Sequence, residues 1–280
     1  MATSPTPAQA DIQPAADLLN ATLIYREDLN PSLSIFRVKP DSGQVADFIP
    51  GQFAMLGLPR PEAPEDADKP AGRVKLVRRA YSIASASTVR DYLEFVIVVV
   101  EGGRFTPLLW NLKPGDRIFM DKLITGKFTL DPVPPNRNLV MVCTGTGLAP
   151  FMSMYRTYCE QPRWRRYIVM SGARKIVDLA YRDELERAAR TDATMTYLPS
   201  VTREPPEAPW TGLRGRVPTF LEPARYAELI GEPLSPETTS LFLCGNPDMI
   251  NDVEKLLAGY GFSTYSKKNP QGNIYFERYW

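Results

Sequence analysis

Histidine is absent from this chain of 280 residues. Histidine is the side chain that most often acts as a general base near neutral pH, and it is a common ligand of zinc. Its absence excludes hydrolysis by a serine–histidine or cysteine–histidine pair, and it excludes histidine-bound zinc. If the chain is an enzyme, we expect a cofactor to supply its chemistry.

Cysteine is scarce, and its three occurrences, Cys143, Cys159 and Cys244, contain no C-x-x-C pair. An odd and dispersed set predicts reduced intracellular thiols rather than a disulfide framework. A plant-type iron–sulfur cluster needs four thiolates at close spacing, so this chain cannot hold one by itself. We therefore expect no metal site.

Long apolar runs and an excess of charge of one sign are also missing. No stretch approaches the roughly 20 apolar residues that span a membrane. The net charge of +1 argues against a general binder of nucleic acid or membrane surfaces. Residues 1–17 lack the basic start and apolar core of a secretory signal and are predicted to be a disordered tail. We expect a cytoplasmic protein, with a monomer as the default state.

The first half of the chain has the pattern of short β-strands. Pro, Gly, Asp and Asn separate its apolar or alternating runs, which favours an antiparallel barrel because a closed sheet leaves no exposed edge. A short helix is expected within Phe105–Leu112, and Pro59–Gly72 is expected to be a flexible surface loop. The predicted strands are Ala21–Tyr25, Leu33–Val38, Gln52–Leu58, Val74–Ala84, Leu93–Val100 and Arg117–Lys122.

The second half alternates between strands and helices, which is typical of a parallel doubly wound sheet. Asp178 is the expected N-cap of one helix, and Asn246 that of the last helix, with Pro247 at its first position. The Pro-rich segment Asp131–Asn138 would divide a barrel domain, residues 18–135, from an α/β domain, residues 136–280. The predicted strands are Leu139–Cys143, Tyr167–Ser171, Thr194–Val201, Ser240–Cys244 and Asn273–Tyr279, and the other predicted helices are Pro150–Cys159, Leu179–Arg190 and Thr219–Ile230.

The tetrapeptide Arg79-Ala80-Tyr81-Ser82 lies late in a predicted barrel strand. An arginine fork can hold a diphosphate, and an aromatic ring can stack on a flavin. A hydroxyl one residue further on can hydrogen-bond the flavin edge. Taken alone, the tetrapeptide is a weak match to a flavin site and is better explained as a strand with an outward arginine and a packed tyrosine.

Two glycine-containing loops follow apolar strands. Glu101–Thr106 would present backbone N–H groups to a phosphate, although a simple turn with a helix cap at Thr106 explains it too. Thr144–Pro150 lies between the first parallel strand and its helix, where glycines let a dinucleotide approach the backbone. Pro150 replaces the third glycine of the usual dinucleotide fingerprint, so an ordinary strand-to-helix loop remains the alternative.

Two further features lie after strands of the second half. Cys244-Gly245-Asn246-Pro247 is a capped helix start whose thiol could also touch a nicotinamide. Arg174, Arg203 and Arg216 lie beyond predicted strands, where an adenosine 2′-phosphate would sit in a nucleotide-binding fold. Each arginine by itself would more often be a solvated surface charge.

The order of these motifs resembles that of the ferredoxin–NADP reductase superfamily. The resemblance runs from about Leu18 to Trp280 and is strongest to bacterial ferredoxin/flavodoxin reductases that end in a tryptophan. It includes Pro50–Phe53, Leu112–Asp116 and the terminal pair Tyr279-Trp280. The resemblance implies a barrel domain that binds FAD, followed by an α/β domain that binds NADP and ends in an aromatic tail.

The resemblance also implies roles for single residues. Arg79 would bind the FAD diphosphate, Tyr81 would stack on the isoalloxazine ring, and Ser82 would lie beside its reactive nitrogen. Ser82, Cys244 and Glu277 would support hydride transfer. The remaining cofactor residues would be Ala80, Val96, Ile97, Val98, Val99, Arg104, Phe105 and Thr106 along the FAD, Thr146 between flavin and nicotinamide, Arg174, Arg203 and Arg216 at the NADP phosphate, and Tyr279 and Trp280 covering the flavin or its adenine.

The implied reaction is hydride transfer between NADPH and FAD, with single electrons passing between FAD and a ferredoxin or flavodoxin. Such carriers are generally acidic, so basic clusters such as Lys122 with Lys127 could steer them. The alternatives are an NADH-linked oxygenase reductase, a flavin or ferric-chelate reductase, a non-catalytic flavin-binding subunit, and a nucleotide-binding protein without flavin. The three arginines count against NADH.

Overall fold

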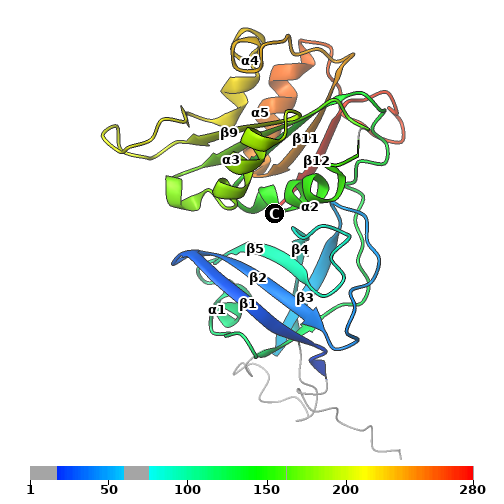
Figure 1. The fold of residues 1–280 in the computed structure, drawn as a ribbon, viewed down its shortest axis with the longest axis vertical. Coiled ribbons are helices and arrows are strands. Elements are labelled where there is room, and N and C mark those ends of the chain that lie inside the picture. The colour runs from blue at the N-terminus through cyan, green and yellow to red at the C-terminus, as the bar shows by residue number, and fades with distance from the viewer. Residues whose placement is uncertain (1–17, 60–75, 162, 280) are drawn as a thin grey trace, which may run out of the picture.

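The computed structural model describes residues 18–59, 76–161 and 163–279. They form two stacked units, a β-barrel at the bottom of Figure 1 and an α/β sheet above it. The predicted tail 1–17, Trp280 and most of the predicted loop Pro59–Gly72 lie outside the described residues. Within the described ranges, no helix is both long enough and apolar enough to cross a membrane.

The barrel contains six antiparallel strands in the order β4-β3-β6-β1-β2-β5. Its two end strands meet just beyond β4, where the N–H of Ala84 donates to the carbonyl of Glu94 at 2.8 Å. Fully buried side chains such as Phe36, Leu56 and Phe95 fill the interior, which confirms the predicted antiparallel barrel. Its elements are β1 (Ala21–Asn30), β2 (Leu33–Pro40), β3 (Phe53–Pro59), β4 (Leu76–Ser82), β5 (Leu93–Val98), the short helix α1 (Thr106–Trp110) and β6 (Arg117–Met120).

The second sheet contains six parallel strands in the order β10-β9-β8-β7-β11-β12. The chain enters at the central strand β7, moves outward on one side and then returns to the other, which confirms the doubly wound prediction. Its elements are β7 (Asn138–Thr144), η3 (Gly145–Leu148), α2 (Ala149–Tyr158), β8 (Arg166–Ala173), η4 (Ile176–Asp178), α3 (Arg182–Thr191), β9 (Met195–Val201), β10 (Leu213–Arg214), η5 (Val217–Leu221), α4 (Pro223–Ile230), β11 (Thr239–Gly245), α5 (Pro247–Ala258) and β12 (Ile274–Arg278), where η denotes a 3₁₀ helix.

Alternate side chains of β7 enter two different cores. Met141 and Cys143 pack with Phe151 of α2 on one face, whereas Val140 and Val142 pack on the opposite face, which α4 and α5 cover. Successive residues of a strand point to opposite sides of the sheet, so a strand covered on both sides is apolar at every position. This packing explains the uninterrupted apolar run in the sequence.

The barrel and the α/β domain share part of one apolar core. Leu33 and Val96 of the barrel are buried in the same cluster as Leu148, Phe151 and Tyr197 of the α/β domain. Burial of apolar surface between two domains favours a stable relative arrangement. The edge of the parallel sheet where α2 begins is thereby held close to β4 and β5, as Figure 1 shows.

The N-cap predicted at Asp178 is wrong. Helix α3 begins at Arg182, and its N-cap is Tyr181 in the left-handed conformation, with φ 54°. The Asp178 carboxylate instead accepts hydrogen bonds from the Lys175 N–H and from Asn30 Nδ2, each at 3.1 Å. Asp178 therefore stabilises a 3₁₀ turn against the β1–β2 hairpin.

Two other helix predictions had different outcomes. The helix predicted at Thr219–Ile230 is divided, because α4 starts at Pro223 and proline is accommodated in the first turn of a helix but not in its interior. The Asn246 cap is confirmed: its side-chain oxygen accepts from the N–H groups of Asp248 and Met249, at 2.7 and 3.4 Å.

Candidate active site

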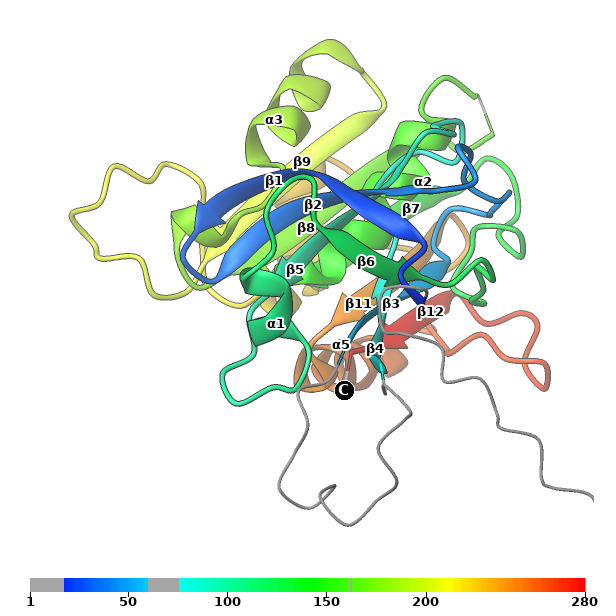
Figure 2. The same cartoon turned by 90° about the horizontal axis from the view of Figure 1, so that it is seen from below.

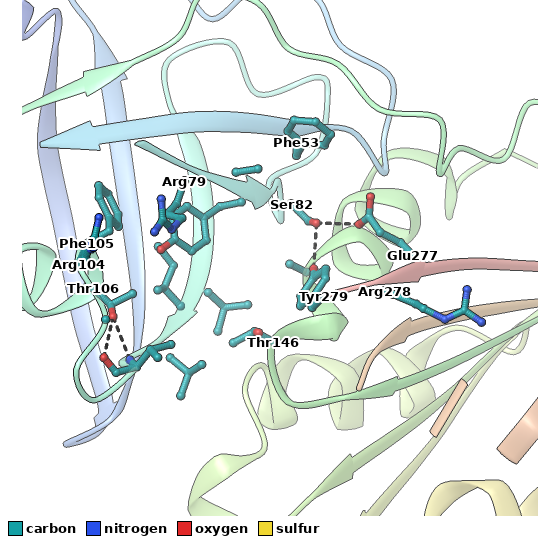
Figure 3. Close-up of a pocket in the computed structure, with 18 residues that line it drawn as sticks. Phe53, Arg79, Ser82, Arg104, Phe105, Thr106, Thr146, Glu277, Arg278 and Tyr279 are labelled. Carbon is teal, nitrogen blue, oxygen red and sulfur yellow. Dashed lines mark hydrogen bonds between the residues drawn. The ribbon is translucent and has the colours of Figure 1, made fainter. Parts of the chain in front are cut away.

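A cavity of about 570 Å³ lies where the barrel meets the parallel sheet. Strands β4 and β5 and the turn before α1 form its barrel side, and α2 and the end of β12 contribute the other side (Figure 3). The structure therefore brings together most of the predicted site. The predicted residues that line the cavity are Arg79, Ala80, Tyr81, Ser82, Val96, Ile97, Val98, Arg104, Phe105, Thr106, Thr146, Glu277 and Tyr279.

One end of the cavity carries positive charge. Arg79 of β4 and Arg104 of the turn between β5 and α1 both line it, and they lie on the same side in Figure 3. Glu277 is the one carboxylate among the described lining residues, and it lies at the other end of the cavity. Two guanidinium groups without a nearby carboxylate suit a diphosphate.

Two other aromatic rings hold the Tyr81 ring in the wall of the cavity. Its centroid lies 6.5 Å from Phe95, in an edge-on arrangement, and 5.7 Å from Phe105. Burial raises the pKa of Tyr81 well above its ordinary value, so the phenol is neutral at physiological pH. A fixed, neutral ring is a suitable surface for a planar aromatic ligand to stack on.

The turn before α1 is shaped by one glycine and one threonine. Thr106 Oγ1 accepts a hydrogen bond from the N–H of Val100 at 2.9 Å, so it ties the turn to the end of β5 rather than capping α1. A Cβ on Gly103 would lie 2.8 Å from the carbonyl oxygen of Val100. Glycine is therefore required for this closed turn, which places Arg104 at the cavity.

A line of hydrogen bonds crosses between the domains at the end of the cavity opposite Arg79 and Arg104. Tyr279 Oη donates to Ser82 Oγ at 2.9 Å, and Ser82 Oγ donates to Glu277 Oε2 at 3.0 Å, as dashed lines in Figure 3 show. The Cys244 thiol contacts the Tyr279 side chain. Ser82 of the barrel and the predicted residues Cys244, Glu277 and Tyr279 of the α/β domain thus form one connected group.

Burial controls the protonation of Cys244, Glu277 and Tyr279. It raises the pKa of the Glu277 carboxyl, and the hydrogen bond from Ser82 offsets only part of that rise. Burial also raises the pKa of Cys244 and that of Tyr279 well above their ordinary values. The thiol and the phenol therefore keep their protons at neutral pH, and Glu277 is the member best placed to exchange one.

The loop Thr144–Pro150 packs against the turn that follows β11. A Cβ on Gly147 would lie 2.3 Å from the carbonyl oxygen of Cys244, so only glycine permits this contact. The N–H of Asn246 donates to Thr144 Oγ1 at 3.0 Å. A Cβ on Gly145 would meet nothing within 4 Å, so the loop has open space on its other side. The two predicted motifs lie side by side at the carboxyl edge of the sheet.

A second cavity of about 640 Å³ adjoins the first, and Thr146 lines both. Arg174, Arg203 and Arg216 all line it, so the structure brings together the three arginines that the sequence placed in separate loops. The N–H of Arg203 donates to the carbonyl of Arg174 at 2.8 Å, which keeps these two adjacent. Arg216 forms an exposed ion pair with Asp252 at 2.8 Å.

A few predicted residues lie elsewhere. Val99 is not among the lining residues of either cavity, and its N–H donates to the carbonyl of Ser32. Cys244 is fully buried behind the loop and lines neither cavity. Sequence reasoning missed several lining residues, although Phe53 and Gly103 lie inside segments that it had singled out. The missed residues are Phe53, Val100, Gly103, Ala149 and Arg278 in the first cavity and Ser32, Leu33, Thr144, Gly145, Gly172, Ala173, Asp178, Thr202, Gly215, Val217, Pro218, Asn246 and Met249 in the second.

The first cavity fits a flavin dinucleotide. It offers guanidinium groups at one end, the aromatic ring of Tyr81 in its wall and a hydroxyl beside a carboxyl at the other end. This series matches a diphosphate, a planar ring system and the polar edge of that ring. The second cavity, with its three arginines, fits a phosphorylated nucleotide that would meet the flavin at Thr146. The fold and the two cavities define a two-domain oxidoreductase that joins a flavin to a pyridine nucleotide.

Comparison with known proteins supports the same class. Residues 20–128 match the family described as oxidoreductase FAD-binding domain, and residues 141–255 match the oxidoreductase NAD-binding domain. The flavodoxin/ferredoxin–NADP reductase of Escherichia coli is 33% identical over 239 residues, which are 84% of this chain and 89% of that protein. The ferredoxin–NADP reductase of Azotobacter vinelandii is 29% identical over 254 residues, which are 88% of this chain and 92% of that protein.

A solved structure of a ferredoxin–NADP⁺ reductase from Neisseria gonorrhoeae, with bound FAD and NADP, superposes with a TM-score of 0.78 at 28% identity. The alignment covers 92% of this chain and 97% of that one. This chain belongs to the ferredoxin–NADP reductase family. The resemblance inferred from the motifs is thereby confirmed.

Proposed function

We propose that this chain is an FAD-dependent reductase that links NADPH to a ferredoxin or a flavodoxin. When bound, FAD supplies the conversion between a hydride and single electrons. The observation that carries the proposal is that the two cavities adjoin at Thr146, next to the hydrogen-bonded group of Ser82, Glu277 and Tyr279. A nucleotide in one cavity and a flavin in the other would meet at that group.

Each part of the first cavity would have a separate task. Arg79 and Arg104 would hold the diphosphate, and Tyr81 would support the ring system of the flavin. Ser82 Oγ would hydrogen-bond the polar edge of that ring, while Glu277 Oε2 accepts a hydrogen bond from the serine hydroxyl and so orients it. The neutral side chain of Tyr279, backed by the buried thiol of Cys244, would keep water and negative charge away from the place where the hydride passes.

Selectivity for NADPH would come from the second cavity. Arg174 and Arg203 carry exposed guanidinium groups at its edge, and no hydrogen bond or ion pair of either side chain was found within the described residues. Both are therefore available to a 2′-phosphate. Arg216 is already paired with Asp252, so a phosphate would have to share it. These roles explain why NADPH, rather than NADH, is the proposed donor.

Partner binding is proposed on the loop after β6. Lys122 and Lys127 are exposed there, and the N–H of Thr125 in the same loop donates to the carbonyl of Phe53, a residue that lines the flavin cavity. The positive loop thus lies next to the proposed cofactor. An acidic electron carrier attracted to it would approach the flavin.

The division into domains at residues 135–136, the monomeric state and the cytoplasmic location remain predictions. The family matches, which end at residue 128 and resume at residue 141, support the division. Size-exclusion chromatography with light scattering would test the predicted monomer.

The first test of the function is spectroscopic. We expect the purified protein to be yellow, or to become yellow with added FAD, and to bleach without oxygen at lower NADPH than NADH concentrations. A yellow protein that prefers NADH would instead indicate an oxygenase-type reductase. A colourless protein that takes up no FAD would contradict the proposed function as a whole.

A further inference from the structure

A buried carboxylate lies at the boundary of the two domains. Glu94 belongs to β5 of the barrel, and its side chain is 3% exposed. Its Oε1 accepts hydrogen bonds from Arg156 Nη1 at 2.7 Å and from Tyr181 Oη at 3.0 Å, and both donors belong to the α/β domain. Its Oε2 accepts from Arg37 Nε of the barrel at 2.7 Å. The Glu94 carboxylate is therefore hydrogen-bonded by side chains of both domains.

Arg156 extends the contact to a second helix and to the barrel backbone. It lies in the last turn of α2, and its Nη1 also donates to the carbonyl of Ala84 at 2.9 Å. Its Nε and Nη2 donate to both carboxylate oxygens of Glu184 on α3, at 2.7 and 2.5 Å. A single guanidinium thus joins α2, α3 and β5, in a planar geometry that lysine could not reproduce.

Tyr181 adopts a conformation that is unfavourable for a residue with a side chain. Its φ of 54° and ψ of 17° place it in the left-handed region, which non-glycine residues seldom occupy. This backbone brings the phenol to Glu94 and the ring to within 4.8 Å of the Arg156 guanidinium carbon. Strain of this kind persists only where the surroundings hold the residue in place.

Helix α2 is bonded to the barrel along its length. Ser153 Oγ donates to the carbonyl of Ser85 at 2.7 Å, and Thr157 Oγ1 accepts from the N–H of Ser87 at 2.9 Å. The same helix begins immediately after the loop that holds Thr146, and its first residue, Ala149, lines the flavin cavity. Thr146 and Val98 of β5 both line the two cavities, so any movement of α2 over the barrel would shift Thr146 relative to Val98.

We propose that Glu94, Arg156 and Tyr181 form an interdomain clamp that sets the position of Thr146 over the flavin site. The three are positioning residues for hydride transfer, and this role rests on the proposed function. The shared apolar core can hold the domains together, but apolar contacts alone specify a relative position weakly. A buried charge has a strong preference for one arrangement, because any shift leaves it without its partners.

Loss of the clamp should lower the rate of flavin reduction without weakening binding in the arginine-lined cavity, whereas general destabilisation of the protein would lower both. Replacement of Arg156 by methionine removes the guanidinium but keeps an unbranched apolar stem. In the FAD-loaded protein, we expect Arg156→Met to slow flavin reduction by NADPH by about 10- to 100-fold, since small misplacements of reacting groups have effects of that size. The affinity for adenosine 2′,5′-bisphosphate, which would occupy only the arginine-lined cavity, should stay within about 2-fold of that of the unaltered protein, a negligible change on the free-energy scale.

Calorimetry provides a readout independent of activity. We expect the unaltered protein to unfold in one thermal transition and Arg156→Met to unfold in two, because the domains would lose the buried ion pair that joins them. The matched control is Arg166→Met, which breaks an ion pair with Glu232 inside the α/β domain and should leave both the single transition and the reduction rate unchanged. Tyr181→Phe, which removes one hydroxyl, should slow reduction to a smaller extent in a protein that still folds.

The outcomes separate the clamp from the proposed function. An unchanged reduction rate in both Arg156→Met and Tyr181→Phe would overturn the clamp, and so would a loss of bisphosphate affinity that matches the loss of rate. If the unaltered protein takes up no FAD, the proposed function fails. The number of thermal transitions would then still decide whether these residues couple the domains.

Discussion

At the scale of single residues, the raised pKa of Glu277 makes stability depend on pH. Burial favours the protonated carboxyl, so the folded protein keeps this proton to a higher pH than the unfolded chain does. The contribution of Glu277 to the free energy of unfolding therefore decreases as pH rises from the unfolded pKa, about 4.3, to the raised folded pKa. It is constant outside that window.

Glu277→Gln should remove this decrease, because the amide oxygen can still accept from Ser82 but carries no titrating proton. We expect the variant and the unaltered protein to be equally stable near pH 4, and the variant to be the more stable near pH 8. Urea unfolding at both pH values measures the difference. A difference that does not grow with pH would contradict the assigned protonation.

Arg203 provides a second test at the residue scale. Its guanidinium is exposed at the edge of the second cavity. A charged hydrogen bond is worth about 1.5–3 kcal/mol, so Arg203→Ala should weaken NADPH binding by about 10- to 100-fold and leave NADH binding nearly unchanged. The control is Arg190→Ala, which removes an exposed charge from α3. Equal losses for NADPH and NADH would show that Arg203 does not contact the 2′-phosphate.

At the scale of elements, the junction of β7 with η3 depends on Gly147, because glycine has no Cβ. Gly147→Ala would place a Cβ 2.3 Å from the backbone oxygen of Cys244, and the facing backbone cannot move without disturbing β11. We expect a loss of about 1–3 kcal/mol in the free energy of unfolding, together with weaker nucleotide binding. Gly259→Ala at the end of α5 is the matched control, since its Cβ would meet nothing within 4 Å. Similar stabilities for the two variants would contradict this account.

Element boundaries also show where sequence reasoning was accurate. Asn246 followed by Pro247 predicted the start of α5 correctly, because both preferences are satisfied by bonds within the element itself. Asp178 looked like an equally good cap, but its carboxylate is engaged by Lys175 and Asn30. A contact with the barrel hairpin decided that boundary, and such a contact has no local sequence signal.

At the scale of the whole molecule, a net charge of +1 conceals a local concentration of positive charge. Lys122 and Lys127 are exposed on one loop beside the flavin cavity. Replacing both with alanine should lower the rate of reduction of an acidic ferredoxin or flavodoxin at low ionic strength, and the difference should shrink as salt screens the charges. Stopped-flow measurements over a salt series would record it.

The control for this experiment changes two lysines on the other domain. Lys267 and Lys268 are exposed in the segment between α5 and β12. Replacing them removes the same charge and should have the smaller effect on partner reduction. If both double variants behave alike, or if salt has no effect on the unaltered protein, electrostatic guidance by the β6 loop is excluded.

The sequence alone determined the fold class and most of the first cavity. Alternation of apolar residues specifies a barrel and then a doubly wound sheet, and local motifs such as Arg79–Ser82 mark the strand that lines the first cavity. These features depend on neighbours close in the chain, so they are legible without coordinates. The absence of histidine is also a property of the sequence alone, and it favours chemistry that a cofactor supplies.

Only the tertiary structure decided how distant residues combine. Ser82 and Glu277 are 195 positions apart, yet they share a hydrogen bond. Arg174, Arg203 and Arg216 converge because parallel strands end at one edge of a sheet. Glu94 has no local sequence signal that distinguishes it from other strand residues, yet in the fold its side chain is buried beside Arg156. Burial sets the protonation of Glu277, and long-range contacts set the positions of Ser82 and Glu94. Neither burial nor a long-range contact is a property of a local stretch of sequence.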